Sequence, residues 1–144
     1  MCFDGASKGN PGRAGGGGVV IDPNGKVEIE YYWNIGYDSN NMAEAYGLWQ
    51  GLKQLKKKGV GEVMVFGDSR LIIHALNGGS QCKNERLARL INRIKSNVKL
   101  FRRISFFHIL RELNSMEDLT ANKSIAVGQN ELYVNLIVST DIPP

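Results

Sequence analysis

The clearest pattern of hydrophobic and polar positions lies at residues 27–35, where apolar and polar side chains alternate. Residues 28, 30, 32 and 34 point one way, and the other side carries Val27, Ile29, Tyr31, Trp33 and Ile35. A period of two is typical of a strand with one buried face. The apolar run at 15–21 precedes it, and the turn sequence Asp22-Pro23-Asn24-Gly25 separates the two. The pattern therefore predicts a β-hairpin.

A helical period replaces the alternation after residue 40. Apolar side chains recur at helical spacing over 41–58 and form one stripe, namely Ala45, Leu48, Trp49, Leu52 and Leu55. Gly59-Val60-Gly61 ends this helix. Two further helices are predicted at 69–76 and at 84–101.

The remaining elements complete an α/β order. Strands are predicted at 2–6, 62–67 and 104–109, and a last helix at 116–127. The order βββαβααβα indicates a five-stranded mixed sheet flanked by helices, in one domain over residues 1–127. The tail, 128–144, receives no function. Its segment 132–138 has strand-like composition, and it either pairs with a sheet edge or stays disordered.

Composition narrows the class of protein. A chain of 144 residues with 42% hydrophobic content can form one ordinary globular core. No apolar run approaches the roughly 20 residues of a membrane span, so no membrane partner is expected. Cys2 and Cys82 make neither a disulfide framework nor a zinc pattern, which favours an intracellular location, cytoplasmic or nuclear.

Basic residues concentrate in one part of the chain. The net charge is only +4, but residues 83–103 contain eight Lys and Arg against one acid, Glu85. Arg86, Arg89 and Arg93 are spaced so that they share one face of the third helix. Such a face favours a polyanion such as nucleic acid, and the alternative is a solvated helix surface.

Four acidic residues stand where backbone elements begin or end: Asp4, Glu44, Asp68 and Asp118. Taken singly, each aspartate has a structural interpretation as a turn residue, a helix cap or a charge near a helix dipole. Glu44 is different, because it falls within the apolar stripe of its helix and should face the sheet. A carboxylate in that position needs a partner or an ion.

The acids lie within longer motifs. The first is Asp4-Gly5-x-x-x-Gly-Asn-Pro-Gly, the second is Asn40-Asn41 followed by Glu44, and the third is Asp68-Ser69. The fourth is Arg111-Glu112-x-Asn114-x-x-x-Asp118. With these four motifs in order, the chain resembles a ribonuclease H domain of the shorter type common in plant proteins and retroelement-derived polyproteins.

The resemblance implies an endoribonuclease that hydrolyses the RNA strand of an RNA–DNA hybrid with two Mg²⁺ ions, which Mn²⁺ can replace. It makes Asp4 the ligand that bridges both ions, Glu44 and Asp68 ligands on the leaving-group side, and Asp118 a ligand on the nucleophile side. Carboxylate oxygens without histidine or thiolate suit these hard cations.

The same resemblance implies contacts to nucleic acid. It implies that the backbone at Gly5 and the side chains of Asn40 and Asn41 contact the 2′-hydroxyls of RNA, although Asn41 could instead cap its helix. Ser69 belongs to the same expected site. The arginine face would contact phosphates of the DNA strand. The partner is then an RNA–DNA hybrid, bound by a monomer or by a part of a longer polyprotein.

Two rival functions stay open. One is a retroelement-derived module that binds nucleic acid with weak or no catalysis, suggested by the short first strand and by Glu117 and Thr120 in the last motif. The other is a nuclease of the same superfamily with another substrate, a 3′–5′ exonuclease or a junction resolvase. An exonuclease would need Asp-x-Glu on the first strand, where this chain has Asp4-Gly5-Ala6.

Overall fold

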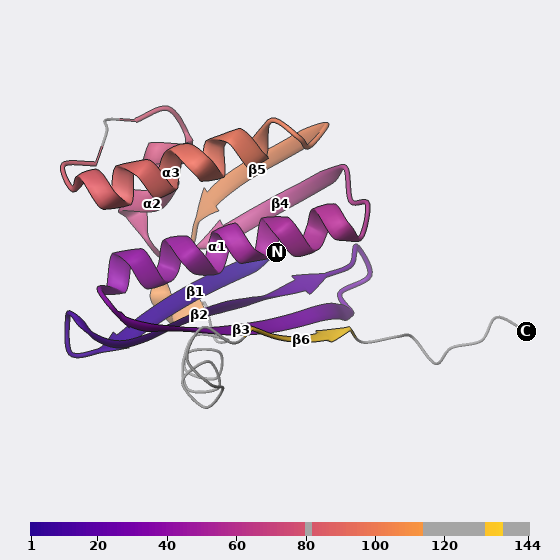
Figure 1. The fold of residues 1–144 in the computed structure, drawn as a ribbon. Helices are drawn as coiled ribbons and strands as arrows, with labels where there is room; N and C mark the ends of the chain where they lie inside the picture. The colour runs from indigo at the N-terminus through magenta and orange to yellow at the C-terminus, as the bar shows by residue number, and fades with distance from the viewer. Residues whose placement is uncertain (80–81, 114–131, 137–144) are drawn as a thin grey trace, which may run out of the picture.

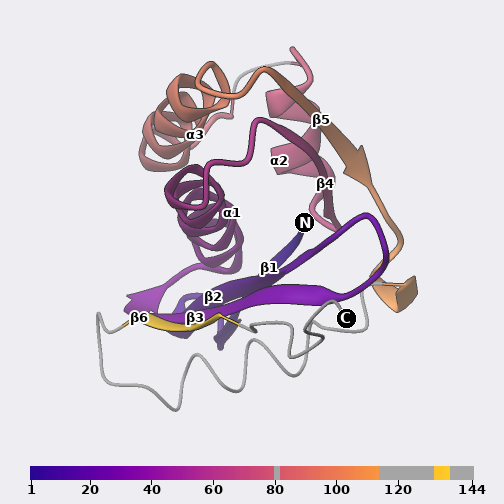
Figure 2. The same cartoon turned by 90° about the vertical axis from the view of Figure 1, so that its right-hand side faces the viewer.

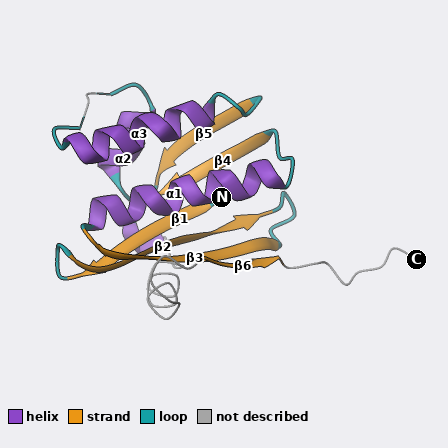
Figure 3. Ribbon diagram, in the orientation of Figure 1, coloured by secondary structure: helices purple, strands orange, loops and turns teal. Residues whose placement is uncertain are grey.

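The computed structural model describes residues 1–79, 82–113 and 132–136. In these residues the strands form one six-stranded sheet with the order β5-β4-β1-β2-β3-β6 (Figure 1 and Figure 3). The strands are β1 Cys2–Lys8, β2 Gly12–Ile21, β3 Val27–Asp38, β4 Glu62–Gly67, β5 Arg103–His108 and β6 Leu132–Leu136. The helices are α1 Asn40–Lys57, α2 Arg70–Leu76, α3 Glu85–Val98 and the 3₁₀ turn η1 Arg111–Leu113.

The sheet is mixed, as the element order predicts. β1, β2 and β3 pair antiparallel, whereas β4 runs parallel to both β1 and β5. The three helices α1, α2 and α3 all lie on one side of the twisted sheet (Figure 2). The five predicted strands are all present, so the predicted fold class is confirmed.

The sheet has one strand more than predicted. β6 pairs antiparallel with β3, the neighbour of β2, through a register that runs from Trp33↔Leu132 to Ile29↔Leu136. Of the two fates open to this segment, pairing with a sheet edge is therefore the one observed for 132–136. The predicted last helix at 116–127, with Asp118, lies outside the described residues.

Each of the three described α-helices starts one residue away from its predicted start, and the capping residues explain why. Ser39 caps α1, because its backbone is extended and its hydroxyl accepts the Met42 N–H at 3.2 Å. The alternative cap role of Asn41 is therefore wrong. Ser69 rather than Asp68 caps α2 in the same way, accepting the Ile72 N–H at 3.3 Å.

The core lies between α1 and the sheet. The stripe residues Leu48, Leu52 and Leu55 of α1 are fully buried, together with Phe3 of β1 and Tyr31 of β3. Among the described helices, none has both the length and the apolar character needed to cross a bilayer.

Candidate active site

Three of the four predicted carboxylates meet at one edge of the sheet. Asp4 lies within β1, Asp68 directly follows β4, and Glu44 lies in the first half of α1. Because β1 and β4 are parallel neighbours, their carboxyl ends share an edge, and the N-terminal part of α1 packs beside it. One oxygen from each carboxylate lies within 4.8 Å of the others. Asp118, the fourth, lies outside the described residues.

Burial makes this cluster costly unless a cation balances it. Asp4 is 3% exposed and Glu44 is 9% exposed, and both carboxylate oxygens of Asp4 are removed from solvent. Three negative groups at this spacing repel one another, and the low-dielectric surroundings strengthen that repulsion. The donors are all carboxylate oxygens, a set that fits Mg²⁺ or Mn²⁺.

A glycine in β1 allows the acids to approach one another. A Cβ placed on Gly5 would overlap the backbone of Ala43 and Glu44 in α1. On the facing helix, a Cβ on Gly47 would come within 2.5 Å of the Asp4 carbonyl oxygen. With no side chain at either position, α1 lies directly on β1, and this close contact carries Glu44 to Asp4.

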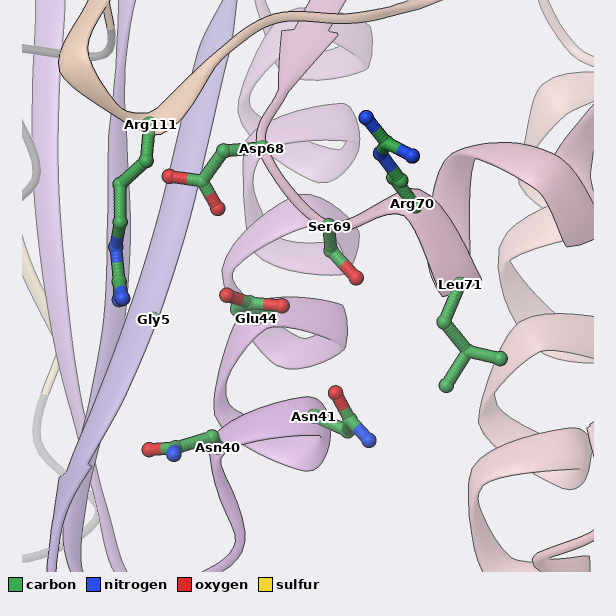
Figure 4. Close-up of a pocket in the computed structure, with 9 residues that line it drawn as sticks. All are labelled: Gly5, Asn40, Asn41, Glu44, Asp68, Ser69, Arg70, Leu71 and Arg111. Carbon is green, nitrogen blue, oxygen red and sulfur yellow. The ribbon is translucent and has the colours of Figure 1, made fainter.

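Two of the three carboxylates, Glu44 and Asp68, open into a cleft of about 370 Å³ (Figure 4). The residues predicted to contact nucleic acid at this edge all line it, along with three that the sequence did not assign. The lining is Gly5, Asn40, Asn41, Glu44, Asp68, Ser69, Arg70, Leu71 and Arg111. The cleft is thus acidic at its base, with amides on one side and two arginines among its walls.

Hydrogen bonds fix one of the two asparagines. The Asn40 side-chain oxygen accepts from both the backbone N–H and the hydroxyl of Ser7, each at 2.8 Å. The Asn40 N–H in turn donates to the Asn10 side-chain oxygen at 3.1 Å. The turn between β1 and β2 is therefore tied to the start of α1. Within the described part of the chain the NH₂ group of Asn40 has no hydrogen-bond partner, so it can donate to a ligand.

The end of β4 is held from β5. Ile109 N–H donates to the Gly67 carbonyl at 2.9 Å, and the His108 Nε2 lies 3.2 Å from the Asp68 carbonyl oxygen. His108 thus contacts the backbone that carries Asp68.

The arginine face of α3 is separate from the cleft. Arg86, Arg89 and Arg93 line a pocket of about 330 Å³ between α3 and α1, together with Met42 and Tyr46 of α1. Arg89 and Arg93 are exposed. Arg86 is exposed as well, but it donates through both guanidinium NH₂ groups to Asp38, at 2.8 and 2.7 Å. These hydrogen bonds raise the pKa of Arg86, against a smaller opposing effect of burial.

A match to a family model accounts for most of the chain. The reverse transcriptase-like family matches residues 2–124, which hold the whole described site. The chain belongs to this family. The reverse transcriptase-like domain is also similar to curated ribonucleases H, which confirms the resemblance carried by the motifs.

Two curated relatives illustrate this similarity. Ribonuclease HI of Halobacterium salinarum is 32% identical over 123 residues, covering 85% of this chain and 62% of that protein. The bifunctional protein Rv2228c of Mycobacterium tuberculosis is 36% identical over 145 residues, covering 97% of this chain and 40% of that protein. The chain thus spans less than two thirds of the length of either relative.

Solved structures agree in fold. The crystal structure of RNase H1 from Halobacterium salinarum matches with a TM-score of 0.82 at 32% identity, over 87% of this chain and 95% of that one. LC11-RNase H1, solved in complex with an RNA/DNA hybrid, matches with a TM-score of 0.81 at 32% identity, over 87% and 94%.

Sequence reasoning missed three residues of this reverse transcriptase-like domain for different reasons. Arg111 stands in the last motif, and its place there was a usable signal. Arg70 follows Asp68-Ser69 directly, so the start of α2 puts it at the cleft. Asp38 carries no signal, because its partner Arg86 lies 48 residues away in the chain.

Proposed function

We propose that this domain is an endoribonuclease that cuts the RNA strand of RNA–DNA hybrids with two divalent metal ions. The observation that carries the proposal is the carboxylate cluster of Asp4, Glu44 and Asp68, in which Asp4 and Glu44 are buried and Glu44 and Asp68 line an open cleft. Membership of the family and the similarity to proteins named ribonuclease H support it.

Each carboxylate has a distinct role in this proposal. Asp4, the most deeply buried of the three, would bridge both ions, and Glu44 and Asp68 would hold the ion on the leaving-group side. Asp118 would complete the nucleophile-side set. When bound, Mg²⁺ or Mn²⁺ supplies a more acidic water and stabilises the charge that develops on the departing 3′ oxygen.

Selection of RNA over DNA falls to the polar walls of the cleft. The NH₂ group of Asn40 and the side chain of Asn41 can donate to a 2′ oxygen, and the backbone at Gly5 lies beside them. The Ser69 hydroxyl, although it caps α2, keeps its own proton to donate to a phosphate or sugar oxygen. Arg70 and Arg111 provide positive charge where the scissile strand enters.

The DNA strand would lie over the arginine face. Arg89 and Arg93 are exposed and line the same pocket, so both can contact phosphates. The hybrid bound by LC11-RNase H1 supports this class of partner. The proposal keeps the domain at residues 1–127 and treats β6 as an added strand at the edge of its sheet. It also includes a monomer or a part of a longer, retroelement-derived polyprotein. The proposed location is intracellular, cytoplasmic or nuclear.

Cleavage of a labelled RNA–DNA hybrid tests the function directly. With Mg²⁺ we expect cuts in the RNA of the hybrid and none in duplex DNA. Asp68→Asn should lower the rate by roughly 10³-fold, since a metal ligand contributes several kcal/mol to transition-state stabilisation. Glu62→Gln, at the opposite end of β4 and paired on the surface with Arg102, is the matched acidic control and should cut normally.

The rival function predicts a different outcome. A protein that binds the hybrid but leaves it uncut with both Mg²⁺ and Mn²⁺ would be a nucleic-acid-binding module. Cleavage from a 3′ end, or of branched DNA alone, would instead favour another nuclease of the superfamily.

A further inference from the structure

An ion pair outside the cleft joins the arginine face to the start of α1. Asp38, the last residue of β3, has a side chain only 5% exposed, and Arg86 meets it with two hydrogen bonds although its own side chain is 57% exposed. Two parallel hydrogen bonds between a guanidinium and a carboxylate fix the orientation of the two groups as well as their distance. Two surface pairs for comparison are Lys58–Glu28 and Arg102–Glu62, and in both of these each side chain is at least 32% exposed.

Asp38 acts on the backbone that follows it. Besides Arg86, its carboxylate accepts the Ser39 N–H at 2.9 Å. Ser39 then caps α1, through its hydroxyl on Met42 N–H and its carbonyl on Ala43 N–H at 3.0 Å. An orientation imposed on Asp38 is therefore passed to the first turn of α1.

That first turn carries the cleft residues. Asn40 and Asn41 open α1, and Glu44 follows after one helical turn, with its backbone against Gly5. From the other side, Ser7 and Asn10 hold Asn40. The helix start is thus held from both the β1–β2 turn and α3, and Arg86 is the α3 residue that bonds to Asp38.

We propose that Asp38 and Arg86 are positioning residues, which fix the first turn of α1 so that Asn40, Asn41 and Glu44 meet the substrate and metal in register. This inference rests on the proposed function. It reassigns Arg86 from a phosphate contact to a support, and leaves phosphate binding on α3 to Arg89 and Arg93. Arg86 would affect turnover, whereas Arg89 and Arg93 would affect affinity.

The test compares Arg86→Met and Asp38→Asn with two references. Arg89→Met removes the same charge from the same face, and Arg102→Met breaks a surface pair with Glu62 whose side chains are 78% and 51% exposed. Hydrogen exchange of the Met42, Ala43 and Glu44 amides is measured together with kcat and KM on the hybrid.

For both Asp38 and Arg86 variants we expect exchange in this turn to accelerate about tenfold and kcat to fall by 10- to 100-fold, on the order of what small misplacements cost. The double variant should be little worse than either single one, because both remove one interaction. Arg89→Met should instead raise KM and leave the exchange unchanged, and Arg102→Met should match the parent protein in both.

Other results overturn the inference. If Arg86→Met raises KM and leaves exchange and kcat unchanged, Arg86 is a phosphate contact. If Arg86→Met behaves like Arg102→Met, the Asp38–Arg86 pair does not position the first turn of α1. If the parent protein cuts no hybrid, the proposed function fails, and the exchange measurement alone then decides the role of the pair. Should Arg86→Met not fold, Arg86→Lys, which keeps the charge but loses the two parallel hydrogen bonds, replaces it.

Discussion

Helix α1 makes two contacts of opposite character, one with the sheet and one with α3. Against the sheet, Gly5 and Gly47 let backbone lie on backbone, and carboxylate oxygens of Glu44 and Asp4 lie within 4.8 Å of each other. Against α3, long side chains such as Tyr46 and Arg89 line a pocket of about 330 Å³. Close backbone contact suits metal ligands, which tolerate little displacement, whereas an open basic face suits phosphates, which offer several contact geometries.

Glu44→Gln is expected to have the largest effect, because it removes a proposed metal ligand on the side of α1 that contacts the sheet. Cleavage should fall by roughly 10³-fold, as for the loss of any such ligand. Without divalent ions, however, the variant should melt at a higher temperature than the parent, since one of three repelling charges is gone. Thermal melts with and without Mg²⁺ check this, and the stabilisation by Mg²⁺ should shrink.

The opposite result would count against a metal site. If Mg²⁺ raises the melting temperature of Glu44→Gln as much as that of the parent, Glu44 is no ligand. Glu85→Gln, an exposed acid in the first turn of α3, is the control, and its response to Mg²⁺ should equal that of the parent.

Gly5→Ala tests the close contact itself. Its Cβ would overlap the backbone of α1, so α1 must move or the strand must bend. We expect a loss of about 3 kcal/mol in the free energy of unfolding, typical of overpacking, with weaker Mg²⁺ binding. Urea unfolding and calorimetry measure the two quantities.

A glycine without such a contact provides the comparison for Gly5. The nearest heavy atom to a Cβ at Gly61 is 4.0 Å away, in Arg102, and the backbone there does not need glycine. Gly61→Ala should leave the free energy of unfolding within about 0.5 kcal/mol of the parent. Equal losses at both positions would mean that the close contact with α1 is not the cause.

Arg89→Met and Arg93→Met test whether the arginine face of α3 binds the phosphates of the hybrid. Each should raise KM several-fold with kcat unchanged, and each should reduce the slope of log affinity against log salt by about one. Binding titrations of the hybrid at several salt concentrations give the slope. An unchanged slope in both variants would make the face a solvated helix surface.

The sequence predicted the structure on the sheet side of α1 better than the structure on its α3 side. On the sheet side, local signals sufficed: alternation predicted β3, the apolar stripe predicted α1, and the place of Glu44 within that stripe indicated a buried carboxylate. On the α3 side, helical spacing predicted that the three arginines share a face, but not that Arg86 faces Asp38. That pairing depends on how two distant elements pack, and periodicity within one element carries no such information.

The ends of elements show the same limit. Asn40 and Asn41 were expected near the helix start, yet Ser39 caps it, because capping depends on which residue first adopts extended backbone geometry. β6 could be recognised by composition, but its pairing with β3 depended on which sheet edge was available. Long-range choices of this kind require the assembled fold.

Tyr31→Phe gives the smallest expected effect and tests a contact between the sheet and α1. The buried Tyr31 hydroxyl donates to the Gly47 carbonyl at 2.6 Å, and its loss should cost about 1 kcal/mol in the free energy of unfolding. Burial raises the pKa of Tyr31 well above its ordinary value. The unfolded chain therefore loses this proton first, near pH 10, and the contribution of Tyr31 to stability is complete below that pH and declines as pH rises above it. Urea unfolding at pH 8 and at pH 10.5 should show a smaller fall for Tyr31→Phe than for the parent. An equal fall in both proteins would mean that other groups set the alkaline limit of this contact.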